Sequence, residues 1–232
     1  RSESHRIDES LDEVFRIARE ARIPAQVYHL KTACAKNWGR MPAVLQHPSG
    51  VPFVAGFGRP VPSLWKSTDN GANWSRVDVA TEAQGAVGNS DVSLAVGPDG
   101  TIYFINMLFD NDSSVGRQIS VGVSSNIGTT WKWTTLSNTR LDDRPWMAVA
   151  QDGTAHAVWN DGAGVSHATS RDRGLTWLEG ARVYGRGGSS HLAVGPGGKV
   201  AVRIPPLSAS GNQSDPGVDL IAVSSDGGVR VG

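Results

Sequence analysis

The chain has 232 residues, of which 39% are hydrophobic and 19% are charged, values typical of a soluble globular protein. Lys plus Arg and Asp plus Glu both number 22, and this zero net charge argues against nucleic acid or an anionic membrane as the main partner. No apolar run is long enough to span a bilayer. The single cysteine, Cys34, excludes an internal disulfide and a multi-cysteine metal site.

The N-terminal segment is the only part of the sequence with a helical pattern. Ser10 and Glu13 form a capping box, and apolar residues follow at 11, 14, 15 and 18, the spacing of one buried helix face. We therefore expect a helix over residues 4–24, ended by Pro24, and then a short strand, "AQVYHL", which contains His29 near its end. A histidine at the C-terminal end of a strand is typical of a (β/α) barrel site.

The pieces "RSE", "REARIPAQVYHLK" and "NWGRM" resemble the N-acyl-D-amino-acid deacylases of the amidohydrolase superfamily over residues 1–45. The resemblance implies that His29 is a zinc ligand. The family's first histidine would precede Arg1, and the ligands from other strands and the catalytic Asp have no counterpart. One helix and one strand cannot form a barrel or a complete zinc site, so we expect no cofactor and no deacylase activity from residues 1–45.

A second pattern begins near residue 46, with no Gly/Ser linker before it. A gene fusion, a rearrangement or an assembly artefact could each produce this join. Residues 46–232 consist of short β-type runs separated by Gly, Pro, Asn and Asp. One turn recurs: "STDNGANW" (67–74), "SSNIGTTW" (124–131), "SRDRGLTW" (170–177) and "SSDGGVRV" (224–231). We call these four segments the repeat turns.

Each repeat turn follows a strand, a glycine turn and another strand, as in "LAVGPDGTIYFI" and "MAVAQDGTAHAVW". Each repeat therefore predicts two hairpins, or four antiparallel strands A to D, over residues 43–80, 91–137, 144–184 and 190–231. One such sheet cannot bury both of its faces alone. Radial stacking of several sheets buries them, so the fold class that we expect is mainly β, a β-propeller with four blades.

The repeat turns are predicted to connect strands C and D and to have a structural role. Glycine permits a positive φ, Asp or Asn can accept hydrogen bonds from backbone amides of its own turn, and Trp can cover the hairpin. Four copies, one with Asn126 in place of Asp, do not suit a catalytic acid. The residues with this structural role are Ser67, Asp69, Gly71, Trp74, Ser124, Asn126, Gly128, Trp131, Ser170, Asp172, Gly174, Trp177, Ser224, Asp226 and Gly228.

The pattern S-x-D-x-G-x-x-W resembles the Asp-box of sialidases and other BNR-repeat propellers. This resemblance implies a glycoside hydrolase, a glycan or glycoconjugate ligand and an extracellular or periplasmic location. Full sialidase propellers have six blades, so four blades predict an incomplete propeller with exposed edge strands. Asp-boxes also occur in non-catalytic propellers.

The resemblance places the active site on the end of the propeller opposite the repeat turns. That end is formed by the loops before strand A and by the B–C loops, which we call the loop rim. An Arg can hold a carboxylate through two hydrogen bonds, and a carboxyl can act as general acid or base. Candidate catalytic residues there are Asp91, Asp142, Asp143, Arg144, Asp161 and Arg203, and candidate binding residues are Arg59, Asp110 and Asn160. We favour "LDDRPW" (141–146), which combines two acids and an Arg.

The chain departs from the sialidase pattern of three Arg, a Tyr–Glu pair and an Asp. The only Tyr of residues 46–232 are Tyr103 and Tyr184 and the only Glu are Glu82 and Glu179, none of them on the predicted rim. Three hypotheses remain open: a sialidase-like glycoside hydrolase fragment with weak or no activity, a non-catalytic carbohydrate- or protein-binding propeller, and a fragment of a zinc-dependent deacylase.

Overall fold

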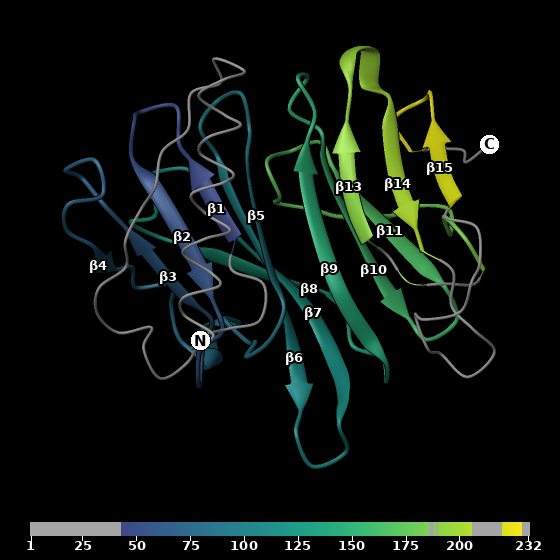
Figure 1. Ribbon diagram of the computed structural model, residues 1–232, viewed down its shortest axis with the longest axis horizontal. Helices are drawn as coiled ribbons and strands as arrows, with labels where there is room; N and C mark the ends of the chain where they lie inside the picture. Colours follow the sequence, from purple (N-terminus) through teal and green to yellow (C-terminus); the bar gives the residue numbers. More distant parts are fainter. Residues whose placement is uncertain (1–42, 186–187, 189, 206–219, 229–232) are drawn as a thin grey trace, which may run out of the picture.

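A computed structural model describes residues 43–185, 188, 190–205 and 220–228 of the protein (Figure 1). Almost all of its regular structure is β. The predicted N-terminal helix and strand lie outside the described residues. Within the described ranges, no helix is both long and apolar enough to cross a membrane.

The strands form four antiparallel sheets in chain order. Blade one contains β1 (Ala43–Gln46), β2 (Pro52–Gly56), β3 (Ser63–Lys66) and β4 (Ser75–Arg76). Blade two contains β5 (Val92–Val96), β6 (Ile102–Asp110), β7 (Val115–Ser124) and β8 (Lys132–Ser137). Blade three contains β9 (Asp142–Val149), β10 (Ala155–Asp161), β11 (Val165–Ser170) and β12 (Leu178–Glu179). Blade four contains, among the described residues, β13 (Ser190–Val194), β14 (Val200–Ile204) and β15 (Leu220–Ser224).

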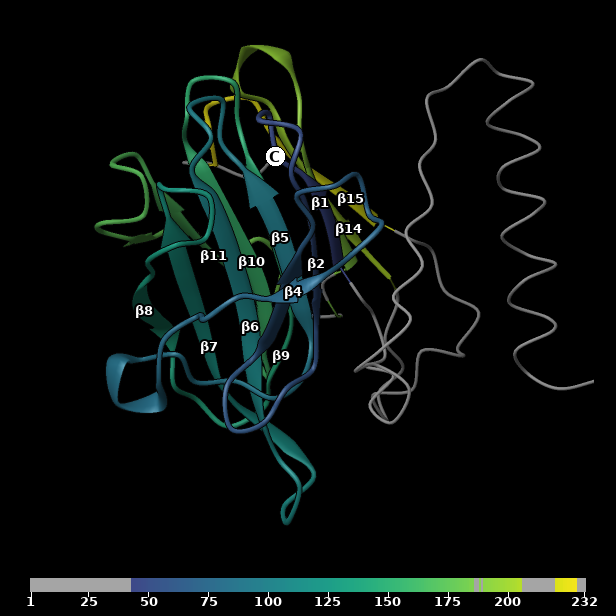
Figure 2. The same cartoon turned by 90° about the vertical axis from the view of Figure 1, so that its left-hand side faces the viewer.

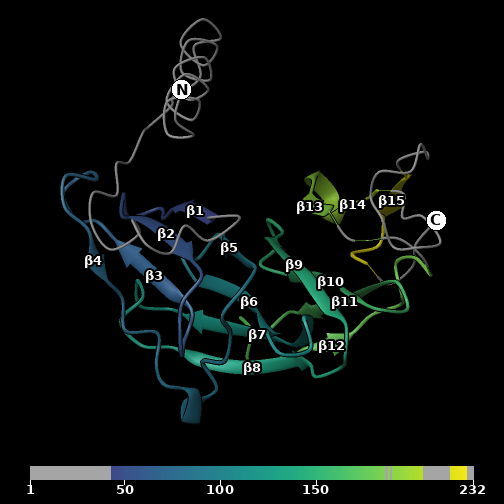
Figure 3. The same cartoon turned by 60° about the horizontal axis from the view of Figure 1, so that its bottom comes forward.

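The predicted repeat of two hairpins is confirmed in the first three blades, each with four strands in the order A to D. Each repeat turn of these blades connects strand C to strand D, as expected. Blade three begins at Asp142, two residues before the predicted boundary at 144. The neighbouring first strands β1, β5, β9 and β13 contact one another in sequence, and the four sheets follow an arc around them (Figure 3). The fold is therefore propeller-like.

The core lies between successive sheets because both faces of the blades are apolar. In β6, Ile102 and Phe104 pack toward blade one, whereas Tyr103, Ile105 and Met107 pack toward blade three. This alternation follows from the twofold side-chain period of a strand. A third apolar cluster, which contains Val158, Val165, Val202 and Ile204, joins blades three and four. Figure 2 shows the central strands β5, β6, β9 and β10 running side by side.

Hydrogen bonds within the repeat turns join the residues to which the sequence assigns a structural role. In the first turn, the Ser67 hydroxyl donates to Asp69 Oδ1 over 2.7 Å and accepts from the backbone N–H of Gly71 over 2.8 Å. Asp69 also accepts from the backbone N–H of Asn73, and the Trp74 indole donates to the carbonyl of Gly71. In the other three turns, too, the glycine N–H donates to the serine hydroxyl, and the serine hydroxyl donates to the side-chain oxygen of Asp or Asn. Asn126 accepts as Asp does, which explains why it can replace Asp.

The repeat turns also join each blade to the preceding one, which the sequence did not predict. A Cβ on Gly128 would lie 3.1 Å from the Phe53 ring of blade one. A Cβ on Gly174 would lie 2.5 Å from Val123 of blade two, and one on Gly228 would collide with His167 of blade three. The ion pair between Arg173 and Asp99, 3.0 Å apart, spans the same junction between blades two and three. Glycine is therefore needed for close packing as well as for turn geometry.

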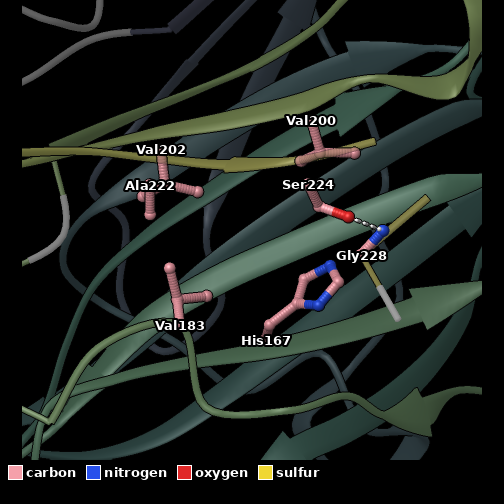
Figure 4. A pocket seen from close by; sticks show the side chains of 7 residues that line it. All are labelled: His167, Val183, Val200, Val202, Ala222, Ser224 and Gly228. Carbon is pink, nitrogen blue, oxygen red and sulfur yellow. Dashed lines mark hydrogen bonds between the residues drawn. The ribbon is translucent and has the colours of Figure 1, made fainter. Parts of the chain in front are cut away.

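The junction between blades three and four contains a buried histidine pair. His156 and His167 are 0% and 2% exposed, their rings are parallel, and Nδ1 of His156 lies 3.2 Å from Nε2 of His167. His167 lines a small apolar pocket with Val200, Val202 and Ser224 (Figure 4). Burial lowers the pKa of both histidines, that of His167 to about 4. Asp152 opposes this effect at His156, and Arg171 reinforces it.

We predict that Gly174→Ala destabilises the protein more than Gly153→Ala. Both glycines have positive φ, +75° and +86°, but only Gly174 faces another blade, because nothing lies within 4 Å of a Cβ on Gly153. The shared backbone strain costs about 1–2 kcal/mol, and the collision with Val123 adds about 1–3 kcal/mol. Denaturant unfolding of the two variants measures the difference. Equal losses would contradict a packing role for this glycine.

We also predict that the contribution of the His156–His167 pair to the free energy of unfolding decreases as pH falls from about 6.5 toward 4. The folded state holds His156 and His167 neutral, whereas the unfolded chain protonates them in this range, so acid favours unfolding. Hydrogen exchange at β13 and β14, followed at pH 7 and 5, reports the loosening of blade four. The variant His167→Gln retains a polar side chain but does not titrate. Unchanged pH dependence in this variant would refute the role of the pair.

Candidate functional site

The loop rim lies at the lower edge of the ribbon in Figure 1, where strands A begin and strands B end. Its most prominent feature is the long hairpin of β6 and β7, which projects beyond the other loops (Figure 2). The repeat turns lie at the opposite end of the blades, as the antiparallel strand order requires. Two neighbouring first strands, β5 and β9, are in contact and bring the acidic loops before them together.

Asp91, Asp143 and Arg144 form a charged cluster where β5 and β9 begin. Nε of Arg144 lies 3.5 Å from Oδ2 of Asp143, and their side chains are 37% and 42% exposed. Burial, and to a lesser extent the negative charge of Asp143, raises the pKa of Asp91 to about 6, against the opposing charge of Arg144. Burial also raises the pKa of Asp143, which Arg144 opposes. The cluster thus holds one carboxyl that can carry a proton near neutral pH.

Backbone bulges present side chains from the two neighbouring strands β9 and β13. In β9 the pairing shifts between Asp143 and Trp146, and the intervening Arg144 has a φ of +47°. In β13 the pairing shifts around His191, which has a φ of +67°. The rings of Trp146 and His191 stack with centroids 4.4 Å apart. Non-glycine residues with positive φ are strained and concentrate at functional sites, so Arg144 and His191 are noteworthy here.

Asp142 serves the fold rather than the charged cluster. It is 0% exposed and accepts hydrogen bonds from the hydroxyls of Ser137 and Thr139, both over 2.8 Å, and from the backbone N–H of Thr139 over 3.0 Å. These bonds tie the loop after β8 to the start of β9. Because its oxygens are occupied within the chain, Asp142 is not part of the site that we propose.

Asp161 and Asp110 are held by their own surroundings. Asp161 accepts from Arg182 and from Ser166, both over 2.7 Å, and these hydrogen bonds lower its pKa to about 2. Asp110 accepts from Ser113 and from Arg117 at the tip of the β6–β7 hairpin, which lowers its pKa to about 2. Both carboxyls are therefore ionised at neutral pH and are unsuited to act as general acids.

The remaining predicted residues are dispersed along the rim or lie outside the described residues. Asn160 is paired in register with Asp143, next to the charged cluster. Arg203 is exposed on β14 and is paired with Ser190. Arg59 is exposed in the B–C loop of blade one. The predicted zinc ligand His29 lies outside the described residues, and the described ones contain no group of three His, Cys, Asp or Glu placed to bind a metal.

The sequence placed none of the described Tyr and Glu residues on the loop rim, and the structure differs at Tyr184, which pairs with Val165 at the rim end of β11. Tyr103 is 1% exposed in the core beside Trp177, and burial raises its pKa to about 12. Tyr184 follows strand D of blade three and pairs with Val165. Glu82 lies in a short 3-10 helix (Glu82–Gln84), and Glu179 lies on the outer strand β12. The described residues therefore do not bring a Tyr–Glu pair to the charged cluster.

No protein-family model matches the chain, and no curated protein matches it in sequence. Among solved structures, the α-L-arabinanase of Penicillium chrysogenum in complex with arabinobiose is similar with a TM-score of 0.59 and 18% identity, over 82% of this chain and 64% of that one. The Hadza microbial sialidase Hz136 gives a TM-score of 0.59 and 17% identity, over 83% and 45%. A Trypanosoma rangeli sialidase gives 0.52 and 18%, over 83% and 37%.

These similarities concern the fold. The chain has a mainly β, propeller-type fold like that of the arabinanase and the two sialidases. It spans less than two thirds of the length of each of these structures. At identities of 17–18%, the similarity concerns the fold and assigns neither an activity nor a sugar substrate to this chain.

We predict that Asp91→Asn raises the free energy of unfolding above that of wild type by more at pH 7 than at pH 4. The folded-state pKa of Asp91 is raised from 3.8 to about 6, so the folded form binds the proton more tightly and loses stability as pH rises through this window. Because the site is partly exposed and screened by solvent, we expect the gain in unfolding free energy at pH 7 to exceed that at pH 4 by about 1 kcal/mol. Denaturant unfolding of wild type and variant at both pH values measures it.

Asp152→Asn is the matched control on the same chain. Hydrogen bonds to Thr154 lower the pKa of Asp152, so its contribution to stability is present at neutral pH and is lost in acid. The two variants should therefore change the pH dependence in opposite directions. A change of the same sign in both would show that the pKa of Asp91 is not raised.

Proposed function

We propose that the chain is part of a glycoside-hydrolase propeller whose loop rim binds a glycan. The observation that carries the proposal is the charged cluster of Asp91, Asp143 and Arg144, at the beginnings of two adjoining inner strands. Two carboxyls in different electrostatic environments are the groups that cleavage of a glycosidic bond requires. The likeness to propeller glycosidases supports the same conclusion at the level of fold.

In this proposal, Asp91 is the general acid. Its pKa of about 6 lets it hold a proton near neutral pH and donate it to the oxygen of the leaving sugar. Asp143, next to Arg144, supplies the negative charge that stabilises the positively charged sugar ring in the transition state. Arg144 opposes the effect of burial on Asp143 and so favours its ionised form, and it can donate hydrogen bonds to sugar hydroxyls. Asn160, opposite Asp143, provides a further donor and acceptor.

Sialidase activity is the finer form of this proposal. It is supported by the resemblance of the repeat turns to Asp-boxes and by the similar folds of two sialidases. Such an enzyme would use Arg144 and Arg203 to hold the carboxylate of sialic acid. The described residues lack a Tyr–Glu pair near Asp91, and the chain covers at most 45% of either sialidase. We therefore expect weak or no sialidase activity.

A non-catalytic propeller that binds carbohydrate or protein is the second candidate. The ion pair between Arg144 and Asp143 favours it, because the guanidinium is already engaged at the site. Glycan binding without turnover would identify this function. A zinc-dependent deacylase would depend on residues 1–45, of which only 43–45 are among the described residues. Stoichiometric zinc together with release of acetate from an N-acetyl-D-amino acid would support it.

We predict slow hydrolysis of a fluorogenic glycoside and a loss of about 10²-fold or more in Asp91→Asn, the size of a typical general-acid contribution. The assay compares a sialoside with an α-L-arabinofuranoside. Asp152→Asn, in the β9–β10 turn at the opposite end of blade three, should keep the wild-type rate. Retention of the rate in Asp91→Asn would exclude Asp91 as the acid. Binding without hydrolysis in the wild type would leave the non-catalytic function.

A further inference from the structure

The charge of the cluster bears on which glycans the rim can accept. Asp91 and Asp143 together carry two negative charges when ionised, and Arg144 carries one positive charge. Arg144 already lies 3.5 Å from Asp143. A carboxylate on a substrate would compete with Asp143 for this guanidinium and would lie beside the negative charge of Asp143, and beside that of Asp91 whenever Asp91 is ionised. At about 4 Å, each such repulsion weakens binding about fivefold in water and more strongly in a partly buried site.

Two other arginines near the rim are also engaged by carboxylates of the chain. Nη2 of Arg117 lies 3.1 Å from Asp110, and Nη1 of Arg182 lies 2.7 Å from Asp161. Each partner carboxyl also accepts hydrogen bonds from neighbouring residues, which fixes it in place. Recruiting either arginine to a substrate anion would break an existing ion pair. Arg117, Arg144 and Arg182 thus balance acids of the protein itself.

We propose that the loop rim takes an uncharged glycan and discriminates against acidic sugars such as sialosides. The proposal rests on the proposed glycan site and defines its substrate class. Hydroxyl groups of a neutral sugar can donate to Asp143 and accept from Arg144 without separating the two, since each hydroxyl is both donor and acceptor. The amide of Asn160, opposite Asp143, adds a contact of the same kind. No group of a neutral ligand needs a free arginine.

The test uses neutral and acidic sugars matched in structure. Lactose is compared with 3′-sialyllactose, and galactobiose with digalacturonic acid, by calorimetry or ligand-observed NMR at low ionic strength. We expect at least one neutral member to bind and its acidic partner to bind about tenfold more weakly or worse, with the gap narrowing as salt screens the charges. Equal or tighter binding of the acidic partner would overturn the inference and leave the glycan site standing. If neither pair of sugars binds and arabinobiose does not bind either, both the inference and the proposed glycan site are refuted.

The variant Asp143→Asn tests the cause of the discrimination. It removes one negative charge and releases Arg144, but it keeps the size of the side chain. We expect the ratio of acidic-sugar affinity to neutral-sugar affinity to rise about tenfold, since only the acidic sugar gains from the lost negative charge and the released guanidinium. Asp152→Asn, at the opposite end of the same blade, should change neither affinity. An unchanged preference in Asp143→Asn would show that another part of the rim selects the ligand.

Discussion

The close contact between the glycine of a repeat turn and the preceding sheet is the constraint on which the blade arrangement depends. Gly128, Gly174 and Gly228 each lie so near a side chain of the previous blade that a Cβ would displace it. The turn must therefore be held rigidly, and the serine hydroxyl and the Asp or Asn oxygen do this through hydrogen bonds within eight residues. Each blade thereby positions the next, and the apolar clusters between them follow.

Because one end of the blades carries this packing, the opposite end can carry polar chemistry. Arg144 and His191 adopt strained backbone conformations there, at bulges where the ladders of β9 and β13 are interrupted. A half-buried carboxyl such as Asp91 is likewise a cost to stability at neutral pH that the turn-side packing can offset.

Features that repeat along the chain could be predicted from the sequence, whereas contacts between different blades could not. The hydrogen bonds of the turn at 170–177 could be predicted from its sequence, because they join residues at most four positions apart. The same sequence did not predict that Gly174 packs on Val123, since this contact joins different blades. Asp142 and Asp143 are adjacent and equivalent in sequence, yet one is fully buried and the other partly exposed. His191 had no sequence signal, because a bulge is defined only by the pairing of two strands.

The sequence by itself determined the fold class and the number of repeats in the chain. It could do so because turn geometry and strand alternation are local, and four copies reinforce one another. Only the tertiary structure decided which acids of the rim are free for chemistry and which ones anchor loops. Burial, ion pairing and pKa depend on groups brought together from different blades, such as Asp91 just before β5 and Asp143 on β9.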